Sequence, residues 1–215
     1  MKKKRNIFND YPSMNKAFFG VLLSLILSLN ACQQGPEYRF QDEPKVVACS
    51  EMPEDFMHEL LYSFREDIGA FYNQYTDYIK GSRSYYFEAY GQYVYFGFSG
   101  TARFDDIASD HSRALLQELR KEKDFWIIKD KQERLNYNHP YLRCLLDDIA
   151  DDDLRISLQN LRQAKSLTPE LIAETMRINV QKVISDPNLS MYLALDGFYQ
   201  PLINRSAKKW VNVKR

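Results

Sequence analysis

Apolar residues recur every three or four positions between residues 54 and 81, and this spacing predicts a long amphipathic helix. Pro53 suits the first turn of such a helix, and Lys80-Gly81 suits its end. Gly69, inside the helix, costs about 1 kcal/mol relative to alanine and marks a bend or a close contact. The apolar stripe contains Phe56, Leu60, Phe64, Ile68, Tyr72, Tyr75 and Ile79.

The next stretch, YYFEAYGQYVYFGFSG, predicts a β-hairpin with its turn at Gly91-Gln92. Glycine suits the first central position of a type II′ turn, and directly opposed residues of a hairpin share a face. Two glycines and many aromatic residues disfavour a helix here. One face of the hairpin then contains Tyr85, Phe87, Ala89, Val94, Phe96 and Phe98 and faces the core. The other, amphipathic face contains Tyr86, Glu88, Tyr90, Tyr93, Tyr95 and Gly97.

Helical spacing returns after the hairpin. Residues 104–123 form one predicted helix, and FWIIK (residues 125–129) is a candidate third strand beside the hairpin. Four later helices are predicted to begin at Pro140, Asp151, Thr168-Pro169 and Asp186-Pro187, the last of them ending near Pro201. The pattern therefore predicts one α+β domain over residues 54–204, predominantly α-helical, with a helical C-terminal half.

The start of the chain has a different pattern. Residues 1–16 are basic, and an apolar run from Ala17 to Leu29 follows them. The run is shorter than the roughly 20 residues that a membrane-spanning helix needs. A basic segment, a short apolar run and a small residue such as Ala31 together describe a secretory signal. An ordinary signal peptide with a chance cysteine at position 32, or a short uncleaved anchor, is the alternative.

The stretch Leu29-Asn30-Ala31-Cys32 resembles the lipobox of bacterial lipoproteins, although Asn30 stands where a small or aliphatic residue is commoner. The resemblance covers residues 1–32 only and does not identify the family of the domain. It implies removal of residues 1–31 and acylation of Cys32, so that lipid chains attach the protein to a membrane. Gln33 stands where aspartate would retain a lipoprotein in the inner membrane. The resemblance therefore implies a cell-envelope protein at the outer membrane, facing the periplasm or the surface.

Charge and composition narrow the class of partner. The chain has 29 cationic and 29 anionic residues; five and one of these lie in the signal, which leaves a net charge of −4. A mildly acidic chain argues against nucleic-acid binding. Residues 32–53 are polar and contain three prolines, so they are expected to form a tether, and residues 205–215 form a basic tail.

Two further cysteines remain after Cys32 is acylated. Outside the inner membrane the compartment is oxidising, so Cys49 and Cys144 are candidates for a disulfide that joins the segment before the first helix to a later helix. Two separate buried thiols are the alternative.

Motifs for catalysis, cofactors and metals are absent from the sequence: it has no phosphate-binding glycine loop, no HExxH and no CxxC. His111 could join Asp106 and Asp110 in a metal site, but it falls on an apolar stripe, which favours a hydrogen-bonded core histidine. We therefore expect no metal and no cofactor.

The second face of the hairpin is the candidate binding surface, because tyrosine offers a flat apolar ring and a hydroxyl. It comprises Tyr86, Glu88, Tyr90, Tyr93 and Tyr95. The alternative is that a helix covers this face. The sequence thus favours a non-enzymatic binding module with a protein partner, in envelope assembly or as a periplasmic inhibitor. The alternatives are an envelope hydrolase whose catalytic groups meet only in the fold and a purely structural lipoprotein.

Overall fold

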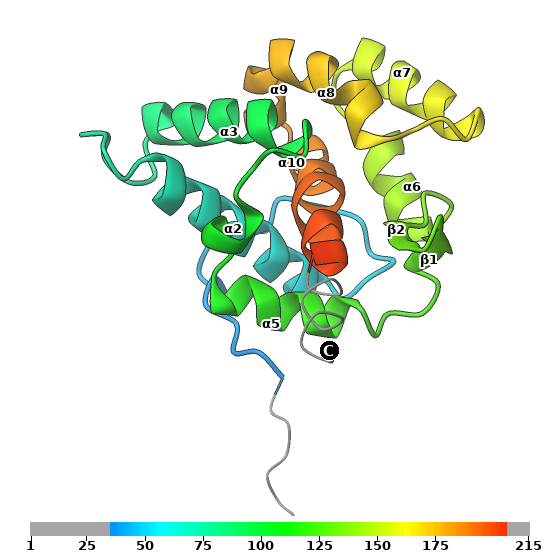
Figure 1. Ribbon diagram of the computed structural model, residues 1–215, viewed down its shortest axis with the longest axis horizontal. Helices are drawn as coiled ribbons and strands as arrows, with labels where there is room; N and C mark the ends of the chain where they lie inside the picture. The colour runs from blue at the N-terminus through cyan, green and yellow to red at the C-terminus, as the bar shows by residue number, and fades with distance from the viewer. Residues whose placement is uncertain (1–34, 206–215) are drawn as a thin grey trace, which may run out of the picture. The chain divides into compact units, whose positions relative to one another are not determined.

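Helix α10 (Pro187–Leu193) and the π-helix η1 (Ala194–Tyr199) run end to end through the middle of the domain (Figure 1). Every residue from Leu189 to Tyr199 is buried, as expected of a helix that is apolar on nearly all sides. The computed structural model describes residues 35–205, and residues from Pro36 onwards belong to one unit of the fold. The predicted signal segment, Cys32 and residues 206–215 lie outside the described residues.

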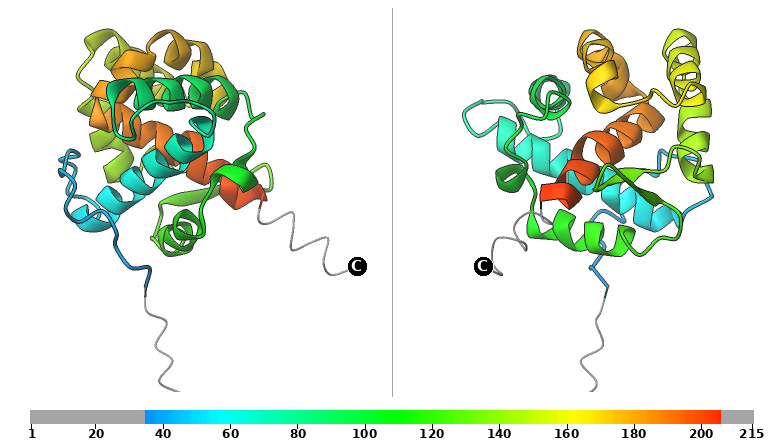
Figure 2. Two further views of the ribbon diagram at one scale, coloured as in Figure 1. Left: turned by 90° about the vertical axis from the view of Figure 1, so that its left-hand side faces the viewer. Right: turned by 45° about the vertical axis from the view of Figure 1, so that its right-hand side comes forward.

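We call α10 and η1 together the central helix. Helix α2 (Glu54–Tyr72) crosses the central helix and packs against it at η1 (Figure 2). The buried Tyr199 hydroxyl of η1 donates a hydrogen bond to the backbone carbonyl of Leu60 in α2, over 2.8 Å. The predicted long helix is therefore present, but it ends at Tyr72 rather than at Gly81.

The predicted β-hairpin is wrong, because residues Arg83–Gly97 form helix α3. Ser82 caps the helix: its side chain accepts a hydrogen bond from the backbone N–H of Tyr85 over 3.2 Å. The helix lies close to α2, since a Cβ atom added at Gly69 would come within 2.6 Å of the Tyr85 ring. The buried residues recur with helical spacing and are Tyr85, Ala89, Tyr90, Tyr93, Val94 and Gly97. Packing of this face overrides the strand preference of the aromatic residues.

The rest of the domain has the predicted mixed class, with a predominance of helix. The remaining helices are α4 (Phe104–Ile107), α5 (Asp110–Leu119), α6 (Pro140–Asp147), α7 (Asp152–Gln163), α8 (Pro169–Ile178) and α9 (Val180–Ser185). The single helix predicted over residues 104–123 is broken between α4 and α5, where Ser109 caps α5. The caps predicted for α7 and α8, Asp151 and Thr168, are confirmed.

A short antiparallel ribbon is the only sheet among residues 35–205. It consists of β1 (Trp126–Lys129) and β2 (Gln132–Leu135), with Trp126 opposite Leu135. The candidate strand FWIIK is confirmed as β1, but its partner is the next segment of the chain rather than residues 85–98.

Residues 36–53 were expected to belong to a tether, but the described part of this segment packs on helix α2. The Glu59 carboxylate accepts the backbone N–H groups of Arg39 and Phe40 over 2.8 and 3.0 Å. The Tyr62 hydroxyl donates to the carbonyl of Pro44 over 2.9 Å. A buried acceptor, Glu59, and a buried donor, Tyr62, on α2 thus hold the backbone of a segment that has no helical or strand structure of its own. None of the helices in the described ranges is long and apolar enough to cross a membrane.

Helical structure continues past Pro201 to Arg205, where the sequence predicts a stop. Proline has no N–H, so in an α-helix the carbonyl of Gly197, four residues earlier, would lose its partner. Here the backbone widens into a π-helix, and the buried Tyr93 hydroxyl of α3 donates to the Gly197 carbonyl over 2.6 Å. Tyr93 therefore replaces the donor that Pro201 lacks.

We predict that Tyr93→Phe lowers the free energy of unfolding by about 1–3 kcal/mol, because it leaves the buried Gly197 carbonyl without a donor. Tyr95→Phe on the exposed side of the same helix is the matched control, and it should change stability by less than about 0.5 kcal/mol. Urea denaturation of both variants measures the difference. Equal stabilities of the two variants would contradict the role assigned to the Tyr93 hydroxyl.

Candidate functional site

The predicted tyrosine surface does not exist, because its members lie on different sides of helix α3. Tyr90 and Tyr93 are 1% and 0% exposed, whereas Tyr95 is 60% exposed. Tyr86 and Glu88 are half-buried. Phe87, which the hairpin register directs into the core, is 45% exposed. The physical reason is the helical rotation of about 100° per residue, which separates residues that alternation places on one face.

Tyr90 is a structural residue in the core. Its hydroxyl lies 2.5 Å from the Ser190 hydroxyl in α10 and accepts a hydrogen bond from Nε of Arg65 in α2. It therefore joins α3 to both the central helix and α2. Tyr90 and Tyr93 together explain why the tyrosine-rich segment is helical: their hydroxyls bond to groups that only a helix brings within reach.

A different aromatic surface is exposed at the start of α3, and we name it the α3 hollow. It is a depression of about 220 Å³ lined by Tyr78, Arg83, Ser84, Phe87, Glu88 and Gln181. Arg83 donates to the Gln181 side chain over 3.1 Å, and Glu88 accepts from Gln92 over 3.0 Å. The hollow therefore combines two aromatic side chains, Tyr78 and Phe87, with a cationic and an anionic side chain, Arg83 and Glu88. Of the predicted binding residues, Glu88 alone lines the hollow.

The loop between α2 and α3 adds to this apolar exposure. Tyr75 and Ile79 are almost fully exposed in it, on either side of Tyr78. The sequence analysis assigned these three residues to the long helix. It placed Tyr75 and Ile79 on the apolar stripe of that helix and so did not predict their exposure. The only change along the stripe is that two tyrosines, Tyr72 and Tyr75, separate Ile68 from the next aliphatic member, Ile79, and the helix ends at the first of them.

A second depression, which we name the arginine cleft, lies beside the π-helix. It has a volume of about 320 Å³ and forms where the end of α3, the start of α4, strand β2, the start of α8 and the last helical residues meet. Its charged lining residues are Arg134, Glu170 and Arg205, and its aromatic lining residues are Phe98 and Phe104. The sequence analysis missed it, because residues from five separate segments form it and no local pattern connects them.

A buried carboxylate lies behind the wall of the arginine cleft. Asp196 of η1 is completely buried and accepts hydrogen bonds from the hydroxyls of Tyr137 and Tyr192, over 2.9 and 2.8 Å. Gln200, which lines the cleft, donates to the same carboxylate over 3.1 Å and accepts the backbone N–H of Leu135 over 2.6 Å. Burial raises the pKa of Asp196 to about 6, although the tyrosine hydroxyls act in the opposite direction. One acid within the apolar run SMYLALDGFY was the sequence signal for this site.

The core contains two hydrogen-bonded pairs of groups that occur in hydrolases, one of histidine with a carboxylate and one of two serines. Nε2 of His111 lies 2.5 Å from Oε1 of Glu59, and the Ser63 and Ser112 hydroxyls are 2.6 Å apart. All four side chains are buried. The prediction that His111 is a hydrogen-bonded core histidine is confirmed. These pairs join α2 to α5, and their burial separates them from solvent and from a substrate.

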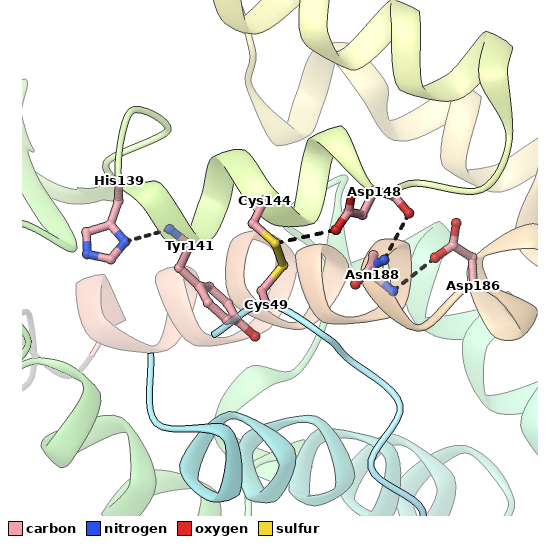
Figure 3. Close-up of a disulfide and its surroundings, with 7 residues drawn as sticks. All are labelled: Cys49, His139, Tyr141, Cys144, Asp148, Asp186 and Asn188. Atoms are coloured by element: carbon pink, nitrogen blue, oxygen red, sulfur yellow. Dashed lines mark hydrogen bonds between the residues drawn. A yellow bond between two sulfur atoms is a disulfide. The ribbon is translucent and has the colours of Figure 1, made fainter. Parts of the chain in front are cut away.

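Cys49 and Cys144 are joined by a disulfide, which links the N-terminal segment to helix α6 (Figure 3). Their Cα atoms are 5.8 Å apart. Asp148 lies at the end of the same helix, and its backbone carbonyl accepts a hydrogen bond from the Asn188 side chain of α10 over 2.9 Å (Figure 3). The disulfide therefore fastens the irregular segment to a helix that already contacts the central helix.

The same two sulfurs and the Asp148 carboxylate form the only group with metal-ligand spacing among residues 35–205. Thiolates bind metal ions well, but both sulfur atoms here are committed to the disulfide. In this oxidised form the group offers a metal a single carboxylate.

No protein-family model matches the chain, and no curated protein or solved structure matches it at a significant level. Inference about function therefore rests on the geometry of this chain.

We predict that Asp196 makes the stability of the fold depend on pH between its ordinary pKa of 3.8 and its raised pKa of about 6. The folded protein holds the Asp196 proton more tightly than the unfolded chain does. Its contribution to stability is therefore complete at low pH and is lost as the pH rises through this window. Two pKa units correspond to about 2–3 kcal/mol.

Asp196→Asn should abolish this contribution, so the unfolding free energies of the wild type and the variant should change differently from pH 4 to pH 7. Chemical denaturation at several pH values measures both. Asp77→Asn, in the exposed loop after α2, controls for the loss of a carboxylate and should follow the wild type. Parallel curves for the wild type and Asp196→Asn would show that Asp196 has no raised pKa.

Proposed function

We propose that this chain is a lipid-anchored protein of the cell envelope that acts by binding a protein partner rather than by catalysis. The lipid on Cys32 attaches it to the outer membrane, facing the periplasm or the surface. The α3 hollow is the contact surface for the partner, in envelope assembly or in inhibition of a toxin or hydrolase.

The observation that carries this proposal is the exposure of Tyr78 and Phe87 in one hollow. Their exposed fractions are 48% and 45%, although each offers a large apolar area that the core would otherwise bury. Aromatic residues and arginine are common among the residues that dominate protein–protein affinity. The hollow has this composition, because Arg83 lies beside the two rings.

The chemistry of the described residues supports binding over the hydrolase alternative. The nucleophile and base candidates Ser63, Ser112 and His111 are buried between α2 and α5. Ser84 lies in the α3 hollow, and among residues 35–205 no histidine or carboxylate is hydrogen-bonded to its side chain. A catalytic serine needs such a base within hydrogen-bond reach.

Lipidation is tested by replacing Cys32 with serine. The wild-type protein should sediment with membranes and incorporate labelled palmitate, and Cys32→Ser should do neither, because the serine hydroxyl does not replace the thiol as the acyl-chain acceptor. Asn30→Ala, which brings the motif closer to the common lipobox, is the control and should retain the label. Palmitate incorporation into Cys32→Ser would refute the lipoprotein assignment.

The contact surface is tested with the double variant Tyr78→Ser/Phe87→Ser. Envelope proteins captured by the tagged, lipidated wild type should bind the double variant at least ten-fold more weakly, because both aromatic anchors are removed. Ile128→Ser is the matched control: this residue is 74% exposed on β1 and is outside the hollow. It should retain capture. Affinities for each purified partner complete the measurement.

Thermal melts establish that the double variant is folded, as expected for two half-exposed side chains. Full affinity of a folded double variant for every captured protein would overturn the assignment of the α3 hollow as the contact surface.

A further inference from the structure

The disulfide between Cys49 and Cys144 lies beside a carboxylate that gains nothing from it. Oδ2 of Asp148 lies 3.5 Å from Sγ of Cys144, one helical turn away on α6 (Figure 3). A disulfide sulfur has no proton, so it donates no hydrogen bond to this oxygen. Asp148 forms no ion pair with a cation in residues 35–205, whereas the adjacent Asp147 lies 3.8 Å from Arg162. The Asp148 carboxylate is therefore available to a cation.

Buried polar groups without partners also lie around this disulfide. Among residues 35–205, four buried side-chain atoms have no hydrogen-bond partner, and two of them are the Tyr141 hydroxyl and Oδ1 of Asn188. Tyr141 lines the same small pocket as Cys49, and the Asn188 amide donates to the backbone carbonyl of Asp148 over 2.9 Å (Figure 3). Such atoms are rare in folded proteins, because each costs the desolvation of the group. The oxidised site therefore leaves a hydroxyl and an amide oxygen unused.

The two sulfurs and the Asp148 carboxylate have the spacing of a three-ligand metal site once the sulfurs are reduced. All three ligand atoms lie within 4.8 Å of one another. On a tetrahedral zinc ion, a thiolate and a carboxylate oxygen are about 3.5 Å apart, and two thiolates are about 3.8 Å apart. Cys144 and Asp148 already have the first of these distances. The second requires that the sulfurs separate on reduction, and rotation about the Cα–Cβ bonds of two residues whose Cα atoms are 5.8 Å apart provides this separation.

The group opens towards solvent, which leaves room for one further ligand. Cys49 is buried, Cys144 is half-buried and Asp148 is exposed. His58 lines the pocket beside Cys49, but its Nε2 lies 2.6 Å from the Phe40 carbonyl and is engaged there. Three protein ligands and one open position are typical of zinc sites that hold a water molecule. The arrangement therefore fits a zinc ion with three ligands from the protein and one from solvent.

We propose that the reduced protein binds one zinc ion through the thiolates of Cys49 and Cys144 and the carboxylate of Asp148. A water molecule completes the tetrahedron. The Asn188 oxygen accepts a hydrogen bond from this water and the Tyr141 hydroxyl donates to the Cys49 thiolate, so both unused groups acquire partners. Two thiolates favour zinc over magnesium and calcium, which prefer oxygen ligands. The ion then replaces the disulfide as the link between the N-terminal segment and α6.

Reduction creates this site, and the reductant is a dithiol. One thiolate of the dithiol attacks Sγ of Cys144, the more exposed sulfur, and the Cys49 thiolate leaves. The second thiolate attacks the mixed disulfide, the Cys144 thiolate leaves, and the dithiol departs as a disulfide. Two electrons thus reach the protein, and the two thiol protons pass to solvent when zinc binds the thiolates. In the oxidising compartment expected for a lipoprotein, zinc binding therefore depends on the delivery of a dithiol.

Zinc binding is tested with the full, lipidated chain in detergent, reduced with dithiothreitol and separated from it by gel filtration under argon. Calorimetric titration with Zn²⁺ should give one site per chain for the reduced protein and binding weaker by about a hundred-fold or more for the oxidised protein, which lacks both thiolates. Co²⁺ in place of Zn²⁺ should produce thiolate-to-cobalt charge-transfer absorption. Equal binding by the two forms, or a reduced protein that neither binds Zn²⁺ nor is refolded by it, would overturn the proposal.

Asp148→Asn distinguishes the three-ligand site from a pair of free thiols. Asp148 is exposed, so this variant should fold as the wild type does. Its reduced form should bind Zn²⁺ more weakly by about ten-fold or more, because the neutral amide replaces a charged ligand. Asp153→Asn is the matched control, since this exposed acid of α7 is outside the group, and it should bind as the wild type does. Unchanged affinity of reduced Asp148→Asn would overturn the three-ligand site.

Discussion

The hydrogen bond from the Tyr93 hydroxyl to the Gly197 carbonyl is the contact on which the centre of the domain depends. It satisfies the carbonyl that Pro201 leaves without a donor, so the central helix continues to Arg205 instead of ending. The helical extension brings Asn204 to strand β2, where its side chain bonds to both backbone groups of Glu133. Asn204 thus adds to the attachment of the two-stranded ribbon, which Gln200 also holds through the backbone N–H of Leu135, and the extension forms the wall of the arginine cleft between Gln200 and Arg205.

The sequence predicted the starts of several helices correctly, because one or two neighbouring residues determine where a helix begins. Side chains that accept backbone N–H groups mark the starts of α7, α8 and α10, and Asp151, Thr168 and Asp186 all do so. Cys49 and Cys144 were candidates for a disulfide because they remain after the predicted acylation of Cys32, in a compartment predicted to be oxidising, and the structure joins them. In each case one or two neighbouring residues carry the information.

The parts that were mispredicted depend on distant partners. Residues 85–98 alternate like a hairpin, yet Tyr90 bonds to Ser190 and Tyr93 bonds to Gly197, about a hundred positions later in the chain. The segment before α2 lacks periodicity and reads as a tether, but its backbone is held by Glu59 and Tyr62. Neither interaction has a local signature, since the strength of a hydrogen bond does not depend on sequence separation. The arginine cleft was missed for the same reason, whereas the α3 hollow was missed because its residues were assigned to the long helix and to the hairpin.

The position of the central helix in the sequence has a consequence for the order of folding. Residues 187–205 are near the end of the chain, yet α2, α3, α6 and β2 all pack or bond against them. A chain that is synthesised from its N-terminus cannot close its core until these residues follow. The contacts that close it span about a hundred residues and more, and folding slows as contacting residues lie further apart in sequence. The incomplete chain therefore leaves the apolar faces of its early helices uncovered during synthesis, when chaperones and proteases can reach them.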